Sequence, residues 1–229
     1  MPSTQPRRPE RPPKISAKGS RKGEQTRRRI LDAALREFGA FGFAGTSTRR
    51  IAEHASVNLP ALRYYFGGKE GLYLACAREI VGEYQAGMQT MQSELRRALD
   101  KGMTRESARA SLKAILRALV DIQIGAQRSD VWMTFVQREI SEQGPAFRLL
   151  FESLWTPGVD LAADLISRIH GEGARTEAAR LRALLLVSSL AAFGVARPIA
   201  LEYLDWPTLE PATLERIKRA FDEQIDQIG

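Results

Sequence analysis

The 229-residue sequence predicts an all-α protein of about nine helices. Apolar residues recur three and four positions apart through most of the chain, which is the period of an amphipathic helix. Glycine and proline interrupt that period at several places, and no stretch alternates apolar and polar residues as a half-buried strand does. The apolar content of 44% is sufficient for a hydrophobic core, and the single cysteine, Cys76, excludes an intramolecular disulfide.

The net charge of +7 is concentrated at the N-terminal end of the chain. Residues 1–22 carry seven Lys or Arg against one Glu, and residues 23–70 carry eight against five Asp or Glu. The remaining 159 residues therefore have a net charge of −2. A basic end on a nearly neutral body indicates a polyanionic partner that is contacted by that end only.

Residues 1–22 contain five of the eleven prolines and almost no large apolar side chains, so we expect this segment to be disordered. Two roles remain open for it: a solvated tail, or a basic arm that contacts phosphates or enters a minor groove. The segment does not resemble a signal peptide, and the longest apolar run, 183–196, is too short to span a bilayer. We therefore expect a cytoplasmic protein that does not enter a membrane.

The first helix is expected at about 24–39, where apolar residues recur at helical spacing, and it should end at Gly39 and Gly42. A long helix should run from Lys69 to about Leu99 and connect this end of the chain to a larger body. The domain boundary is placed in the first turns of that long helix, at residue 70. Five further helices are expected in the body, at about 105–124, 129–141, 146–169, 175–199 and 212–228.

Residues 46–65 read as two short helices joined by a tight turn. Thr46 and Ser47 form a suitable N-cap region for the first helix, and Asn58 caps the second. The second helix carries Arg63, Tyr64 and Tyr65 close together. This pattern indicates a helix-turn-helix whose second helix enters the major groove of DNA.

Three blocks in this region also carry a resemblance to a known family. They are G-A-F-G-F-A-G-T-S-T-R-R-I-A, A-S-V-N and L-R-Y-Y-F-G-G-K-E-G-L-Y, and over about 24–84 the chain resembles the DNA-binding domain of TetR-type transcriptional regulators. The C-terminal part more weakly resembles the CecR/YbiH branch, through R-E-I-S-E-Q-G-P-A-F at 138–147 and F-G-V-A-R-P-I-A-L-E-Y-L-D-W at 193–206. The resemblance implies a homodimer that binds DNA and an unknown small-molecule effector.

The resemblance also implies which residues contact DNA. Thr46 and Ser47 would donate to phosphates, Lys69 would bind another phosphate, and Arg49 is a further candidate. The positions that would face the groove or the sugar-phosphate backbone are Pro60, Ala61, Arg63, Tyr64 and Tyr65. The chain departs from the family pattern at Ser56, where Gly is usual and a left-handed backbone would cost about 1–2 kcal/mol. It also departs at Pro60, often Gly, and at Tyr65, usually His.

Two sets of residues in the body have alternative interpretations. One set would line a ligand cavity or would belong to ordinary core: Trp132, Phe135, Arg138, Phe151, Trp155 and Phe193. The other would form half of a dimeric four-helix bundle or would be buried within one monomer: Leu184, Leu185, Ser188, Leu214, Ile217 and Phe221.

Together these observations predict an N-terminal three-helix DNA-binding domain, 23–70, joined by a long helix to an α-helical ligand-binding and dimerisation domain, 71–229. The expected function is a ligand-responsive repressor that binds an inverted-repeat operator as a homodimer. We expect no enzyme activity, cofactor or metal, because two histidines and one distant cysteine form no ligand set and no serine has a nucleophile-elbow context. The alternatives are a sequence-tolerant architectural DNA-binding protein and a helical small-molecule carrier or enzyme.

Overall fold

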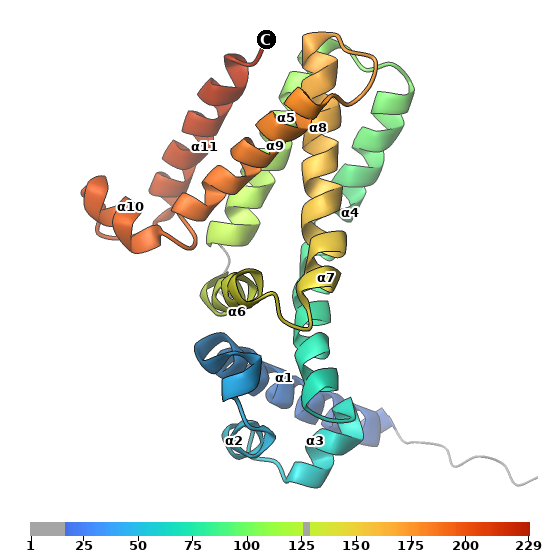
Figure 1. Cartoon of the computed structure of the whole chain (residues 1–229), viewed down its shortest axis with the longest axis vertical. Coiled ribbons are helices and arrows are strands. Elements are labelled where there is room, and N and C mark those ends of the chain that lie inside the picture. Colours follow the sequence, from blue (N-terminus) through green and yellow to red (C-terminus); the bar gives the residue numbers. More distant parts are fainter. Residues whose placement is uncertain (1–16, 126–128) are drawn as a thin grey trace, which may run out of the picture.

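The computed structural model describes residues 17–125 and 129–229, and every regular element in that part of the chain is a helix. Figure 1 shows an elongated molecule with a small head, formed by α1, α2 and α3, at one end. The long helix α4 rises from the head into a larger helical body. The all-α class predicted from the sequence is therefore confirmed.

The head contains three helices: α1 (Ala17–Gly45), α2 (Thr48–His54) and α3 (Leu59–Phe66). Helix α1 is longer than expected, because Gly39 remains helical and the break falls at Gly42, with φ 71° and ψ 176°. Residues 17–22, predicted to be disordered, form the first turns of α1, whereas residues 1–16 lie outside the described residues. Ser47 and Asn58 cap α2 and α3 as predicted.

The connecting helix and the body supply the remaining elements. In order these are α4 (Lys69–Asp100), α5 (Arg105–Val120), a π-helical turn (Asp121–Gly125), α6 (Ser129–Glu142), α7 (Phe147–Leu150), a second π-helical turn (Phe151–Trp155), α8 (Thr156–His170), α9 (Glu177–Ser188), a 3₁₀ turn (Ser189–Ala192), α10 (Arg197–Tyr203) and α11 (Pro211–Asp226). The short α7 continues through its π-helical turn into α8, as the single helix expected at 146–169.

The single helix predicted at 175–199 is wrong, because the chain breaks there. Helix α9 passes through the 3₁₀ turn and then bends by 76° into α10. Pro198 lies in the first turn of α10, where its missing N–H costs no intrahelical hydrogen bond. Among the described residues no single helix has the length and apolarity of a membrane span, and only the bent pair formed by α9, its 3₁₀ turn and α10 passes that test.

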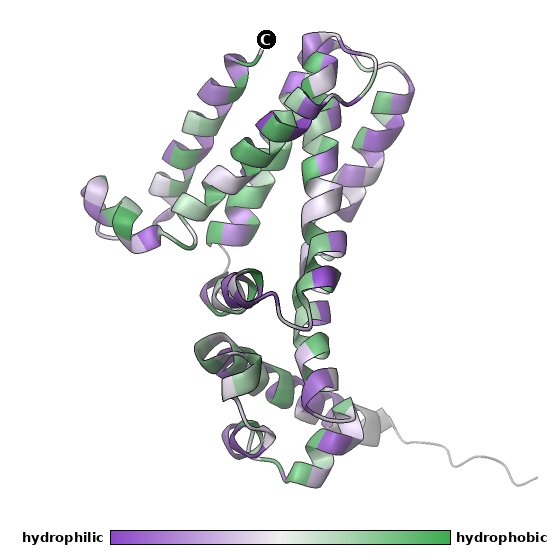
Figure 2. Ribbon diagram, viewed as in Figure 1, coloured by the Kyte–Doolittle hydropathy of each residue, from purple (hydrophilic) through white to green (hydrophobic). Residues whose placement is uncertain are grey.

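Two hydrophobic clusters hold the molecule together (Figure 2). One lies in the body between α5, α8, α9 and α11. The other lies in the head, but it extends along α4 to Val81 and also includes Phe135 of α6 and Leu150 of α7. Head and body therefore share a core, and the boundary expected at residue 70 divides the chain without dividing the apolar packing.

Ser56 tests the energetic cost of the turn in the helix-turn-helix. Its φ of 51° is left-handed, which is the case for which the departure from the family's usual Gly implies a cost. Replacing Ser56 by Gly should therefore raise the free energy of unfolding by about 1 kcal/mol, because glycine adopts this conformation without a clash between Cβ and the backbone. Urea denaturation would measure the change.

Ser93 provides a control of opposite sign. It is exposed within α4, where glycine should lower the free energy of unfolding by about 0.5 kcal/mol, because serine has the higher helix propensity. Equal destabilisation by both substitutions would show that Ser56 is not strained.

Candidate nucleic-acid interface and effector cavity

A buried carboxylate attaches α2 to α1. Glu37 of α1 is buried, yet its oxygens lie 2.7 Å from Arg50 Nε and 2.8 Å from His54 Nδ1. Both partners come from α2, so one residue of α1 fixes the orientation of the whole second helix. The sequence reasoning missed Glu37, although an acidic residue between Leu35 and Phe38 on the apolar side of a helix is a signal of a buried ion pair.

Thr46 belongs to the same junction, and its predicted phosphate contact is wrong for its hydroxyl. That hydroxyl is buried and lies within hydrogen-bonding distance of the Glu37 and Gly42 carbonyl oxygens, at 3.0 Å and 2.8 Å. Ser47 is the neighbour that remains exposed; its oxygen accepts from the Arg50 N–H at 3.3 Å. Its hydroxyl proton is still able to reach a phosphate at this helix end.

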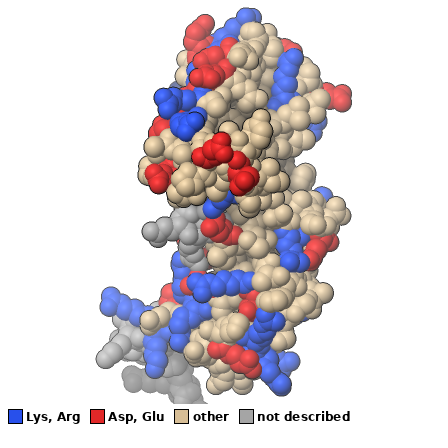
Figure 3. Space-filling view, turned by 90° about the vertical axis from the view of Figure 1, so that its left-hand side faces the viewer, with Lys and Arg blue, Asp and Glu red and all other residues tan. Residues whose placement is uncertain are grey.

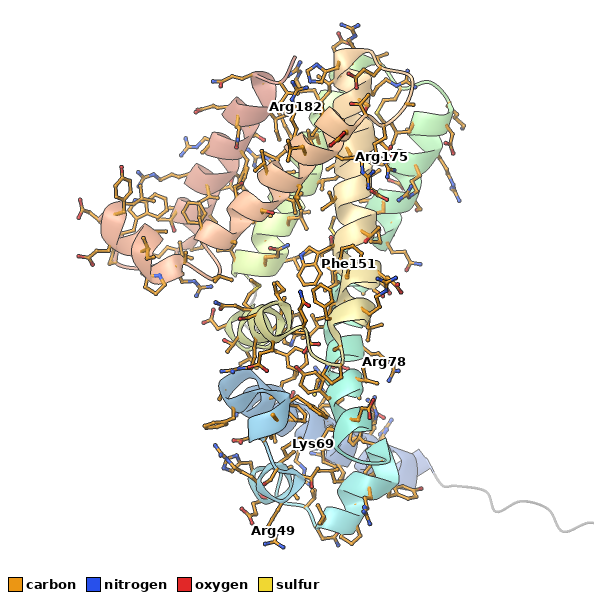
Figure 4. All side chains as sticks on the ribbon, in the orientation of Figure 1. Arg49, Lys69, Arg78, Phe151, Arg175 and Arg182 are labelled. Carbon is orange, nitrogen blue, oxygen red and sulfur yellow. The ribbon has the colours of Figure 1, made fainter. Side chains whose placement is uncertain are left out.

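Basic side chains gather on the head. On the face shown in Figure 3, Lys and Arg are concentrated over the lower part of the molecule, while the body shows large uncharged areas. Figure 4 shows Arg49 at the lower end of the head, pointing away from the body. Arg50 is less available, because its guanidinium also lies 3.7 Å from the centre of the Phe41 ring.

Helix α3 divides its residues between the core and solvent. Leu62 is fully buried in the head, whereas Pro60, Arg63 and Tyr64 are exposed, Tyr64 by 83%. Ala61 is half-buried and donates its backbone N–H to the Asn58 side chain. An exposed Arg beside an exposed Tyr, on a helix whose other side is anchored, is a suitable surface for contacting base edges and phosphates.

Tyr65 and Lys69 contact their own head. Tyr65 is half-buried and packs edge-on against Tyr64, with ring centres 5.2 Å apart. The Lys69 ammonium lies 4.7 Å from the centre of the Phe43 ring and 3.4 Å from the Ala44 carbonyl oxygen. These contacts hold the beginning of α4 against the end of α1, and the DNA contacts predicted for both residues stay predictions.

The body contains a cavity of about 250 Å³ between α4, α5, α6, α8 and α9. Trp132 and Trp155 line it, as predicted. The complete lining is Ile80, Tyr84, Leu119, Ile122, Gln123, Trp132, Met133, Val136, Ile140, Leu154, Trp155, Gly158, Val159, Leu184, Val187, Ser188, Ala191 and Val195.

The other four residues predicted to line the cavity lie elsewhere. Phe135 is buried in the core of the head, with its ring centre 4.8 Å from that of Tyr73. Phe151 is exposed and stacks on Phe147, whereas Phe193 stacks on Trp206. Arg138, the fourth, points towards the head. Aromatic composition could not distinguish these environments, because Phe135 lies on a helix with two differently occupied faces and Phe193 lies in the turn before α10.

Helix α6 has one face in the cavity and the other against the head. Its Trp132, Met133, Val136 and Ile140 line the cavity. From the opposite face, Arg138 donates to the Gly39 carbonyl at 2.8 Å and to the Ala40 carbonyl at 3.0 Å. These two carbonyls directly precede the break in α1, so Arg138 holds the end of α1 at the point where the chain turns towards α2.

Glu139 ties α6 to α4. Its carboxylate is fully buried and accepts hydrogen bonds from the Tyr73 hydroxyl and from the Ala146 N–H, the latter at 2.6 Å. Burial and the neighbouring carboxylate raise the pKa of Tyr73, so its hydroxyl remains a donor at neutral pH. Adjacent residues of α6 therefore bind two different helices, α1 of the head and the connecting helix α4.

The residues predicted to form a dimer interface fall into two groups. Leu184, Leu185 and Ser188 are exposed on α9, and Leu184 and Ser188 also line the cavity. Ile217 and Phe221 are buried in the body cluster, and Leu214 packs against it. The dimer role of Ile217 and Phe221 is therefore wrong, because α5 of the same chain covers them, whereas that of the partly buried Leu214 stays a prediction.

Comparisons with known proteins agree with this architecture. Residues 30–76 match the profile of bacterial regulatory proteins of the tetR family. Residues 108–228 match the profile of the C-terminal domain of the HTH-type transcriptional dual regulator CecR. CecR of Shigella flexneri is 31% identical over 209 residues, which cover 90% of this chain and 92% of that protein.

Two further relatives cover less of the chain or show the fold alone. The HTH-type transcriptional regulator RutR of Escherichia coli is 40% identical over 81 residues, 35% of this chain and 38% of that protein. A TetR-like transcriptional regulator from a Rhodococcus species has a TM-score of 0.60 at 22% identity, covering 87% of this chain and 94% of that one. On the evidence of both profiles and of the full-length relative, the chain belongs to the TetR family of DNA-binding transcriptional regulators, with a C-terminal domain of the CecR type.

Proposed function

We propose that this regulator acts in the cytoplasm as a homodimeric repressor that releases an inverted-repeat operator when a small molecule occupies the body. The observation that carries the proposal is the division of α3, with Leu62 anchored in the head and Arg63 and Tyr64 exposed. This face suits a recognition helix in the major groove, with Ser47 and Arg49 on neighbouring phosphates. The catalytic alternative has no support, because the relatives are regulators.

The exposed face of α9 supports the dimer. Leu181, Leu184 and Leu185 are 57%, 49% and 64% exposed, on a helix at the outer side of the body. Soluble monomers seldom leave adjacent large apolar side chains uncovered. A two-fold pair of such faces would bury them and would place two heads on half-sites about one helical turn of DNA apart or somewhat more.

Helix α6 supports a route for the ligand response. Any molecule that fills the cavity contacts the Trp132 side of α6. The opposite side carries Arg138, and Glu139 lies beside the cavity-lining stripe, bonded to Tyr73 of α4. A displacement of α6 would therefore move the end of α1 and the first half of α4 together. A difference of about 1–3 kcal/mol in ligand affinity between the DNA-competent and DNA-incompetent states would be sufficient for control.

Arg63 tests base recognition. Replacing Arg63 by Ala should relax the preference at one base pair of each half-site by about 1–3 kcal/mol, because a bidentate contact to guanine is lost. Selection from a randomised duplex library, with the wild type and the variant in parallel, would measure the preference at every position.

Arg49 is the matched control for Arg63. Replacing Arg49 by Ala should weaken binding to all sequences alike, as expected for a phosphate contact. Unchanged base preferences in the Arg63→Ala variant would exclude Arg63 as the base-reading residue.

Leu185 tests the dimer. Replacing Leu185 by Glu should convert the dimer to a monomer, because a carboxylate would be desolvated at the centre of the apolar face. Light scattering after size-exclusion chromatography would report the mass. Phe151→Glu, at an exposed position away from α9, should leave the mass unchanged, and a dimer that tolerates Leu185→Glu would place the interface elsewhere.

Arg138 tests the connection between α6 and the head. Replacing Arg138 by Ala removes the donor of two carbonyls beside the break in α1, which should speed amide exchange at residues 41–46 about tenfold or more. Hydrogen exchange with mass spectrometry would measure this. Arg148→Ala provides the control, since Arg148 is exposed and pairs with Glu152 on its own turn; equal effects of the two variants would contradict a specific role for Arg138.

A further inference from the structure

The cavity in the body has an uncharged lining. None of its described lining residues is Asp, Glu, Lys, Arg or His. Three charged residues near the cavity are bonded elsewhere: Arg138 of α6 to α1, Glu139 of α6 to Tyr73, and Arg197 of α10 to Asp130, at 2.7 Å. An ionised ligand would lose its hydration here without gaining an opposite charge, which is strongly unfavourable.

Three polar groups nevertheless face the cavity. Tyr84, Gln123 and Ser188 contribute a hydroxyl, an amide and a second hydroxyl to its lining. Burial raises the pKa of Tyr84 above its usual 10, so this phenol is a neutral donor at physiological pH. A small number of neutral polar groups in an apolar pocket orients an uncharged ligand through one or two hydrogen bonds.

The size and shape of the cavity restrict the ligand further. An apolar cavity of about 150 Å³ in another protein accommodates benzene, so the 250 Å³ found here has room for about two fused rings. Trp132 and Trp155 line the cavity with flat indole rings, against which an aromatic ligand is able to stack. Ile140 and Val195 line it and are also partly exposed, so the cavity has an apolar rim open to solvent.

We propose that this cavity binds an uncharged molecule of two fused aromatic rings carrying one or two hydrogen-bonding groups, and that such a molecule is the effector. The effector role rests on the ligand response proposed above. The ligand class rests on the lining alone. An uncharged lining excludes carboxylates, phosphorylated metabolites and organic cations as ligands of this cavity.

A matched set of naphthalene derivatives tests the ligand class. Naphthylmethanol, naphthoate and naphthylmethylammonium share one ring system and differ in charge. In isothermal titration of the full-length protein at neutral pH, the alcohol should bind and each ion should bind at least about tenfold more weakly. An ion that binds as tightly as the alcohol, or an alcohol that does not bind to the folded protein, would overturn the proposal.

Substitution of Gln123 assigns the binding to this cavity. Gln123→Glu places a carboxylate in the lining and should weaken binding of the alcohol while reversing the preference in favour of the ammonium probe, by about tenfold in the ratio of affinities. Gln137→Glu is the control, because Gln137 is exposed on α6 and does not line the cavity. Thermal melting of both variants verifies the fold. Identical probe preferences in the two variants would show that the probes bind elsewhere.

The DNA affinity of the same samples tests the effector role separately from the ligand class. With saturating naphthylmethanol, the affinity for a selected operator should fall at least about fivefold. Binding of the alcohol with unchanged DNA affinity would overturn the effector role and leave the ligand class standing. Preferential binding of an ion would overturn the ligand class whatever happens to DNA binding.

Discussion

A carboxylate buried in a protein must be hydrogen-bonded or paired. Two buried carboxylates in the lower half of the molecule, Glu37 and Glu139, each join two helices in this way. Glu37 on α1 is paired with Arg50 and His54 of α2, which fixes the helix-turn-helix to the first helix. Glu139 on α6 accepts hydrogen bonds from the Tyr73 hydroxyl and the Ala146 N–H. Removing either partner would leave an uncompensated charge, so in the ligand response proposed above these junctions would move together with the helices that they join.

Helix α6 is consequently the element shared by the cavity and the head. Four of its residues line the cavity, while Arg138 on the opposite face holds α1 and Glu139 beside the cavity-lining stripe holds α4. The long helix α4 also reaches from the head into the cavity through Ile80 and Tyr84. Helices α4 and α6 therefore both connect the head to the cavity. These two connections explain why the head does not have a core of its own, and why the apolar packing continues across the boundary predicted at residue 70.

The uncharged lining of the cavity follows from the same arrangement. Arg138 and Glu139 of α6 are bonded to α1 and α4, and Asp130 pairs with Arg197, so the side chains that α6 presents to the cavity are apolar or aromatic. Selectivity for neutral ligands would then be a consequence of how the head is attached. The charged residues of α6 would hold the helix in place. The lack of charge among its cavity-lining residues would favour neutral ligands.

The sequence by itself determined the all-α class, the positions of most helices, the caps of the helix-turn-helix and the basic charge of the head, since all of these depend on local periodicity, capping and composition. Only the tertiary structure decided that the Thr46 hydroxyl is internal, that Phe135 belongs to the head and not to the cavity, and that Ile217 and Phe221 are covered by their own chain. An apolar or polar side chain has the same local signature whichever partner covers it. The choice between core, cavity and interface depends on contacts between residues far apart in the sequence, such as Arg138 with Gly39, and local patterns do not encode them.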